Sequence, residues 1–333
     1  MSKRIQWIDV AKGIGILLVV YGHALGGIMN ADQGGNTNIL QVLYNIIYGF
    51  HMPLFFFLSG IFARNWVKRA VGIALRQKIT SLVIPYFIWT VITGSIMALA
   101  QKYTNSGLGI RNILLSPVAP FSEYWFLYVL FVTFVVYYFG VRLFGEQGIL
   151  GIAVIFFLLR PFIYHYWIFD AFSLNFVFFC IGTEVFELNQ VFEFLEYSKK
   201  KVLLAVLLFI IINVMNLAVL KTNNYMAESY TKALTVIIGV LLIVYIAQWL
   251  EHFPKLTTRL AWLGRASMAI YVMHLIPIAG SRIIALNVLK INSLFLLSIT
   301  ISIIALTMCL IGYYLLEKTK IGRLSFGEGL KTK

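Results

Sequence analysis

Long, nearly continuous apolar runs occur along the whole chain and predict membrane-spanning helices. Each run has about the 20 residues that a helix needs to cross the hydrocarbon core of a bilayer. The runs do not alternate between apolar and polar positions as the strands of a membrane β-barrel do. We therefore predict an all-α polytopic membrane protein, a bundle of about ten transmembrane helices, in which residues 1–333 form a single integral-membrane domain. The predicted spans are 10–29, 40–62, 79–100, 124–143, 148–163, 168–186, 202–220, 230–250, 262–286 and 294–316.

The composition agrees with this pattern. Of the 333 residues, 60% are hydrophobic and only 12% are charged, and the mean hydropathy is +0.87. A soluble protein of this length needs more charged residues to cover its surface.

The net charge of +14 would suit a nucleic-acid-binding protein, but its distribution indicates a membrane topology instead. With the N-terminus inside, 19 of the 27 Lys and Arg residues fall on the cytoplasmic side of the predicted spans and seven on the outer side. Positive residues prefer cytoplasmic loops. We therefore expect both termini in the cytoplasm and no nucleic-acid partner.

The first predicted span contains two ionisable residues, Lys12 and His23. At about 100° per residue, their separation of eleven positions places them roughly 20° apart around the helix and roughly 16 Å apart along it. Ionisable side chains within a span usually face a protein interior. The two residues thus predict a polar stripe that begins near the cytoplasmic end, although a lysine there can also simply snorkel to the interface.

Two more histidines lie within predicted spans. His51 precedes Pro53 in the second span, where the proline can kink the helix, and His274 lies about halfway through the ninth. Each is a candidate for the site, His51 for catalysis and His274 for substrate contact. Each can also be a core histidine that forms hydrogen bonds to a neighbouring helix.

The fourth span begins with Glu123 and Trp125, which are candidates for contacts with a substrate. The aromatic residues there are also typical of a membrane-interface belt. The segment 63–78 is basic with interspersed apolar residues and predicts an amphipathic helix at the cytoplasmic interface. Its cations can bind an anionic donor or only fix the topology; the candidates for donor binding are Arg64, Arg69, Arg76 and Lys78.

These residues favour acyl transfer. Histidine is the usual general base near neutral pH, and here it would deprotonate an acceptor hydroxyl. An anionic thioester would dock on the cytoplasmic cations. The sequence has no carboxylate pair of the glycosidase type, no Gly-rich phosphate loop and no clustered metal-ligand motif, so we expect no metal.

Five stretches resemble the membrane-bound acyltransferase-3 family, and they follow the family's order over nearly the whole chain. The chain is similar to the stand-alone members, including the fucose 4-O-acetylase-like group. The stretches are WIDVAKGIGILLVVYGH (7–23), FHMPLFFFLSGIFAR (50–64), KITSLVIPYFIW (78–89), YWFLYVLF (124–131) and LGRASMAIYVMH (263–274).

The resemblance implies a ten-helix bundle that transfers an acyl group, commonly acetyl from acetyl-CoA, to a sugar of a surface glycan or its lipid-linked precursor. The family's first helix carries a basic residue, ten other residues and then a histidine, and Lys12 and His23 match it. His23 is then the expected catalytic base, and Lys12 supports the donor or the charge of the site. The family also tends to have paired arginines before the Pro-Tyr of the third helix, whereas Lys78 and Ser81 precede Pro85 here.

Two other classes of function fit the same residues. A glycolipid or polysaccharide-precursor transporter, or flippase, would use them as substrate contacts and need no acyl-CoA. A membrane sensor or scaffold would not need the buried histidines. The resemblance favours the enzyme, in the bacterial inner membrane, with acyl-CoA, a glycan or lipid-linked sugar acceptor and membrane lipids as its partners.

Overall fold

A computed structural model describes residues 5–30, 37–99, 109–163, 166–187, 189–222, 224–287, 289–291 and 293–328. The chain divides into two compact units. Unit 1 consists of Met1–Gly15, Asn45–Ala74 and Val132–Arg265, and unit 2 consists of Ile16–Tyr44, Leu75–Phe131 and Ala266–Lys333. Because the segments of the two units alternate along the sequence, neither unit is a continuous stretch of chain.

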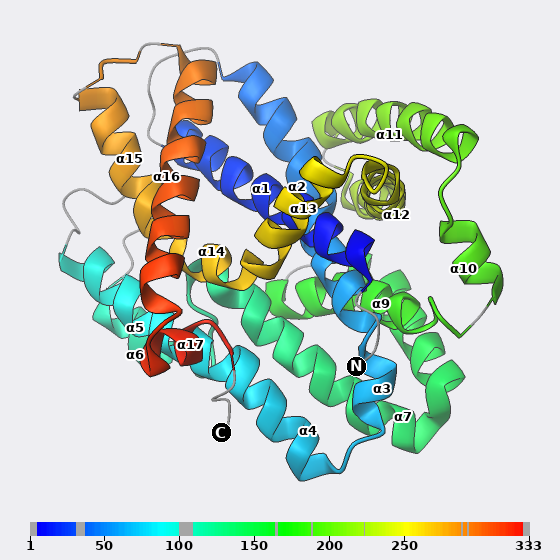
Figure 1. Ribbon diagram of the computed structural model, residues 1–333. Coiled ribbons are helices and arrows are strands. Elements are labelled where there is room, and N and C mark those ends of the chain that lie inside the picture. The colour runs from blue at the N-terminus through cyan, green and yellow to red at the C-terminus, as the bar shows by residue number, and fades with distance from the viewer. Residues whose placement is uncertain are drawn as a thin grey trace. The chain divides into compact units, whose positions relative to one another are not determined.

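The described part of the chain is helical and contains no strand. Four helices contribute residues to both units: α1 (Gln6–Met29), α2 (Asn38–Gly60), α4 (Val71–Lys78) and α7 (Trp125–Leu158). Unit 1 also contains α3 (Ala63–Val67), α8 (Arg160–Ile163), α9 (Trp167–Thr183), α10 (Asn189–Leu195), α11 (Lys199–Val219), η3 (Leu220–Thr222), α12 (Tyr225–Leu250) and α13 (Pro254–Arg265). Unit 2 also contains η1 (Ile79–Val83), α5 (Ile84–Leu99), α6 (Ile110–Leu115), η2 (Ser122–Tyr124), α14 (Ser267–Met273), α15 (Leu275–Asn287), α16 (Leu294–Leu316) and α17 (Lys320–Ser325) (Figure 1).

The all-α, multi-pass architecture is confirmed, but the helices long enough to span a membrane are fewer than the ten predicted. Within the described residues seven helices qualify by length and composition, and eight qualify if one bent pair counts as a single span. The seven are Gln6–Met29, Asn38–Gly60, Val71–Leu99, Ser122–Leu158, Lys199–Thr222, Tyr225–Leu250 and Leu294–Leu316.

Two departures from the predicted spans lower the count from ten to eight. The predicted spans 124–143 and 148–163 lie mainly on α7, which is interrupted at Gly145 with φ 72° and ψ 175°. This left-handed backbone region is readily reached only by glycine, so the chain changes direction there without a loop. The predicted span 168–186 corresponds to α9, whose 17 residues make it shorter than the other spans.

The predicted span 262–286 is broken, and the break lies at His274. The two helices α14 and α15 meet there at an angle of 59°. Pro277, in the first turn of α15, has no N–H to donate to the carbonyl of Met273, and its ring clashes with that carbonyl in a straight helix. The proline therefore explains why the helix bends one turn before it.

Polar side chains define where three of the long helices begin. Ser198 Oγ accepts the N–H of Lys201 at 3.2 Å at the start of α11, and Asn224 Oδ1 accepts the N–H of Ala227 at 3.1 Å at the start of α12. Ser293 does the same for α16. These residues satisfy N–H groups that have no partner within the first helical turn.

In unit 1, α2 and α9 cross at two glycines. A Cβ atom on Gly60 would overlap the backbone carbonyl of Phe179, and one on Gly182 would overlap the backbone carbonyl of Phe57. Small residues allow the backbones of membrane helices to approach closely and gain packing energy. This crossing fixes the end of α2 against α9.

We predict that Gly60→Ala destabilises the protein by about 1–3 kcal/mol, because the added methyl group must push two helix backbones apart. The measurement is the thermal unfolding midpoint in detergent micelles. Gly151→Ala is the matched control, since a Cβ on Gly151 in α7 meets nothing within 4 Å. If Gly60→Ala unfolds at the same temperature as the wild type, the close crossing is wrong.

In unit 2, the broken helix packs against α16 and α5. The helices α15 and α16 lie side by side (Figure 1), and α14 contacts both α16 and α5. The guanidinium of Arg282 on α15 donates from Nη1 to the carbonyl oxygen of Gly27 at 2.5 Å. This bond ties the last turns of α1 to the helix that begins just after His274.

Candidate active site

Three residues that the sequence analysis named separately lie together in unit 2: His23 on α1, Glu123 on η2 and His274 at the break between α14 and α15. His23 Nε2 is 3.7 Å from Glu123 Oε2, and the ring centroids of His23 and His274 are 4.8 Å apart, with the rings inclined at 46°. The side chain of His23 is 10% exposed and that of Glu123 is 35% exposed, whereas His274 is fully buried. We call this group the histidine–glutamate cluster.

The backbone at the helix break determines the protonation pattern of His274. Its Nδ1 lies 2.5 Å from the carbonyl oxygen of Tyr271. A carbonyl only accepts hydrogen bonds, so Nδ1 must carry the proton. In the neutral imidazole, Nε2 then has a free lone pair, and within the described part of the chain this buried atom has no hydrogen-bond partner. His274 therefore presents an unpaired acceptor beside His23.

Glu123 is positioned by hydrogen bonds to its own backbone and to its neighbour. The hydroxyl of Tyr271 donates to the backbone carbonyl of Glu123. The hydroxyl of Tyr124 donates to the carbonyl of Val272 at 2.8 Å and lies 2.6 Å from Thr93 Oγ1. Because Tyr124 uses its only proton on Val272, Thr93 donates to Tyr124. The broken helix and the segment around Glu123 are thus joined by two hydrogen bonds. Tyr124 binds the carbonyl of Val272, and Tyr271 binds the carbonyl of Glu123.

The chain reaches Glu123 through a strained turn. Ser122 has φ 45°, a left-handed conformation that non-glycine residues seldom adopt. Just before it, the hydroxyl of Tyr86 on α5 accepts the N–H of Phe121 at 3.2 Å and donates to the carbonyl of Ser116 at 2.7 Å. Strained residues persist where the surrounding bonds over-determine them, and they concentrate at functional sites.

The cluster has the groups required for proton transfer. An imidazole can take a proton near neutral pH, and the carboxylate of Glu123 lies close enough to His23 to stabilise the imidazolium that forms. A second imidazole, 4.8 Å away centroid to centroid, is held in one tautomer by Tyr271. This arrangement suits general acid–base chemistry on a hydroxyl group.

The remaining candidate residues divide between the two units. Lys12 and His51 belong to unit 1, where Lys12 Nζ is 5.9 Å from the ring centroid of Phe62 and the buried His51 places Nδ1 2.8 Å from the carbonyl oxygen of Ile47. Trp125 is half-buried at the first position of α7, two residues after Glu123. Lys12 and His23 are nevertheless carried by one uninterrupted helix, α1.

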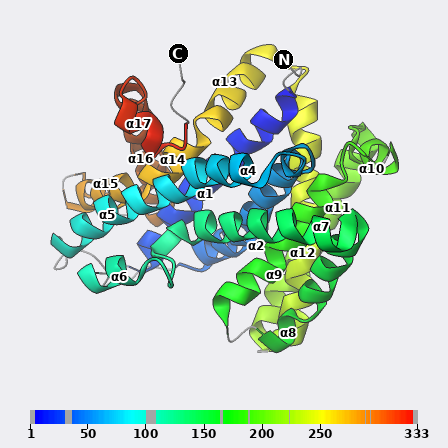
Figure 2. The same ribbon diagram turned by 90° about the horizontal axis from the view of Figure 1, so that it is seen from below.

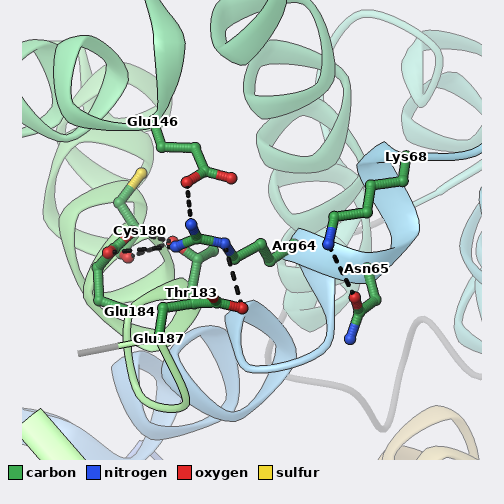
Figure 3. Close-up of polar contacts among 8 residues, drawn as sticks. All are labelled: Arg64, Asn65, Lys68, Glu146, Cys180, Thr183, Glu184 and Glu187. Atoms are coloured by element: carbon green, nitrogen blue, oxygen red, sulfur yellow. Dashed lines mark hydrogen bonds and ion pairs between the residues drawn. The ribbon is translucent and has the colours of Figure 1, made fainter. Parts of the chain in front are cut away.

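Arg64 lies among carboxylates in unit 1, which the sequence analysis did not foresee. Its guanidinium forms ion pairs with Glu146, with Glu184 at 3.4 Å and with Glu187 at 3.3 Å. Figure 3 shows the three carboxylates around the guanidinium, which projects from α3. The positive charge of Arg64 is thus more than balanced, and a phosphate group would have to compete with three carboxylates.

The rest of the basic segment has a different environment. The predicted single helix 63–78 consists of α3 and α4, separated by a short link. Arg69 lies exposed in that link, Arg76 is exposed on α4, and Lys78 is half-buried at the end of α4. Unlike Arg64, Arg76 has a side chain that faces away from the protein interior.

A family model described as an acyltransferase domain, acyltransferase 3, matches residues 5–316, which is almost the whole chain. The chain belongs to the acyltransferase-3 family. The family resemblance found in the sequence motifs is therefore confirmed. At the level of the family, this chain is a multi-pass membrane protein that transfers acyl groups.

Curated relatives match a shorter part of the chain. A nodulation protein NolL of Mesorhizobium japonicum is 26% identical over 139 residues, which cover 40% of this chain and 35% of the relative. A nodulation protein NolL of Sinorhizobium fredii is 30% identical over 136 residues, 40% of this chain and 36% of the relative. The alignments thus span about a third of the length of these relatives. No solved structure matches the chain.

Sequence reasoning missed the tyrosines that support the cluster in this family member. Tyr271 lies one helical turn before His274, and Tyr124 directly follows Glu123, so both were within quoted motifs. Spacing alone would have flagged Tyr271, because residues three positions apart on a helix are neighbours. The pairing of Tyr124 with Val272 joins residues 148 positions apart, and no local pattern reveals it.

Proposed function

We propose that this protein transfers an acetyl group from acetyl-CoA to a hydroxyl group of a sugar in a cell-surface or exported glycan, with His23 as the catalytic base. The observation that supports this proposal is the approach of His23 Nε2 to Glu123 Oε2, beside the unpaired Nε2 of His274. Family membership supplies the reaction class, and the cluster supplies residues able to perform it.

The proposed reaction is a direct displacement. The imidazole of His23 removes the proton of the acceptor hydroxyl while the hydroxyl oxygen attacks the thioester carbonyl. The new ester C–O bond forms, the C–S bond breaks, and the departing CoA thiolate takes the proton from the imidazolium. Glu123 stabilises the imidazolium between these two proton transfers. Trp125 next to this cluster offers an aromatic face for the sugar.

The residues proposed to bind the acyl donor are chosen for their positive charge. Arg76 and Lys78 on α4, together with Arg69, are the cations proposed to bind the phosphates of CoA. Arg64 is left out of this set because three carboxylates already surround it. Lys12 precedes His23 by eleven residues on α1, and we assign it a supporting role for the donor. His51 has no assigned step.

His274 is proposed to accept a hydrogen bond from a second hydroxyl group of the acceptor sugar. We predict that His274→Asn raises the acceptor KM about tenfold with a smaller change in kcat. Asparagine can keep the donor that binds the carbonyl of Tyr271, but it has no atom at the position of Nε2. His274→Gln, which can place an oxygen near that position, is the comparison and should retain more of the affinity. Equal KM values for both variants and the wild type would disprove this role.

The mass of the acceptor tests the reaction class. Purified protein in nanodiscs is incubated with acetyl-CoA and a panel of glycans and lipid-linked sugars, and the acceptors are analysed by mass spectrometry. We expect a mass gain of one acetyl group that requires acetyl-CoA. If the acceptor keeps its mass while a lipid-linked sugar crosses the bilayer, the protein is a transporter and the proposal is wrong.

The proposed location is the inner membrane of a bacterium. The apolar helices and the family support a multi-pass membrane protein. An acceptor that belongs to an exported glycan, and a donor made in the cytoplasm, would both be accessible to an enzyme in that membrane.

A further inference from the structure

A second polar cluster lies in unit 1, where the ends of α8, α9 and α12 meet. Arg160 begins α8 and is only 3% exposed, and its guanidinium binds Asp170 in the first turn of α9 through two bonds. These join Nε to Oδ1 at 2.9 Å and Nη2 to Oδ2 at 3.2 Å. The short helix α8 contacts both α9 and α12, as Figure 2 also shows.

The cluster contains one buried cationic donor that has no partner among the described residues. Arg160 Nη1 is buried and has no hydrogen-bond partner in the described part of the chain. Lys232 on α12 is close enough to Arg160, Asp170 and Glu228 for their charges to interact. Lys232 is half-buried and forms no ion pair or hydrogen bond with any residue that the structure describes. A buried donor without a partner costs free energy, and the cost is higher for a charged group.

Asp170 does not satisfy Arg160 Nη1, because its two oxygens lie against the other edge of the guanidinium, at Nε and Nη2. The two-bond pairing instead fixes the orientation of the guanidinium and leaves Nη1 pointing away from Asp170. A ligand that satisfies Arg160 Nη1 and Lys232 together must be an anion with at least two oxygen acceptors. Arginine and lysine are the residues that usually bind phosphate in this way.

Exposed aromatic side chains at the same helix ends indicate where such an anion would come from. Tyr166 and Trp167 lie exposed at the start of α9, and Tyr225 and Tyr230 lie exposed in the first turns of α12. Exposed tyrosine and tryptophan at the ends of membrane helices mark the level of the lipid headgroups. Basic residues at this level bind phosphate headgroups.

We propose that Arg160 and Lys232 form a binding site for a phosphate group. A membrane lipid would carry this group in its headgroup. The site is independent of the acyl-transfer reaction proposed for the histidine–glutamate cluster, since it uses residues of unit 1 only.

The test measures lipid retention by native mass spectrometry of the full-length protein. The probes are phosphatidic acid, diacylglycerol, which has the same tails without phosphate, and inorganic phosphate as a competitor. We expect the wild type to retain phosphatidic acid and to retain diacylglycerol far less. Lys232→Gln should weaken phosphatidic acid binding about tenfold. Lys221→Gln, which removes an exposed lysine near the end of the neighbouring helix α11, should leave binding unchanged.

A second variant is a control for misfolding, since removing Arg160 alone would leave the partly buried Asp170 without its partner. The double variant Arg160→Gln/Asp170→Asn removes both charges together, and it should also lose phosphatidic acid while its thermal unfolding midpoint stays near that of the wild type. Displacement of phosphatidic acid by inorganic phosphate would support the phosphate site but overturn a lipid as its source. Equal retention of phosphatidic acid by the wild type, Lys232→Gln and the double variant would overturn the site itself.

Discussion

Replacing His23 with alanine is expected to lower kcat for acetyl transfer by about two to four orders of magnitude. A positioned general base contributes a factor of this size, and no other group of the cluster can replace it without movement. His274 has an unpaired nitrogen, but the structure places Glu123 beside His23, so the imidazolium is stabilised there. The measurement is the initial rate of acceptor acetylation at saturating acetyl-CoA.

His252→Ala is the matched control for this prediction. His252 is exposed just after α12 in unit 1, where its ring binds the nearby carbonyl of Trp249 and lies 5.7 Å, centroid to centroid, from the ring of Tyr197. Its removal should leave the rate unchanged. A His23→Ala protein that is folded, inserted in the membrane and fully active would remove His23 from the mechanism.

Glu123→Gln is expected to lower kcat about tenfold to hundredfold and to change the KM values little. Two unit charges about 4 Å apart interact by roughly 1 kcal/mol in water and by roughly 4 kcal/mol near a protein surface. Glu123 is 35% exposed and lies 3.7 Å from His23, so its contribution falls between these limits. Because the charge of His23 develops only during the reaction, the effect belongs in kcat.

The glutamine keeps the size of Glu123 and removes only its charge. Glu193→Gln on the exposed helix α10 is the control for the loss of one negative charge, and it should behave as the wild type. A Glu123→Gln enzyme with an unchanged kcat and a raised acceptor KM would show that Glu123 binds the substrate and does not stabilise the imidazolium.

Much of the fold follows from local sequence, because hydrophobic length and capping residues act over a few positions. The spans that begin after Ser198, Asn224 and Ser293 lie within a few residues of their predicted starts. The departures from the predicted spans are local: the 17 residues of α9 make it short, and α14 and α15 meet at an angle of 59° at His274. The gap between the predicted spans 124–143 and 148–163 coincides with the interruption of α7 at Gly145, so the position of that break follows from local sequence.

The candidate site could be predicted only in part. Ionisable residues within apolar runs identified His23, Glu123 and His274 singly, since a buried charge is costly wherever it occurs. That these three residues meet was not predictable, because they are separated by about a hundred residues or more and the helix break depends on Pro277.

Arg64 shows that tertiary contacts can neutralise a charge that the sequence suggests is available to a ligand. A basic segment next to a span suggests anion binding, but the carboxylates that surround this arginine come from α7 and from the chain after α9. Arg160 and Lys232 are two of the seven Lys and Arg residues on the predicted outer side, and no local pattern distinguished them from the other five. Charge composition thus locates candidates, and tertiary contacts decide which charges remain available to a ligand.

The most direct test of the central claim follows donor binding and transfer in the same sample. Wild type and His23→Ala in nanodiscs are given radiolabelled acetyl-CoA, first alone and then with an acceptor glycan. We predict that both proteins bind the donor and that only the wild type moves the label to the glycan. Transfer by folded His23→Ala at the wild-type rate would contradict the account.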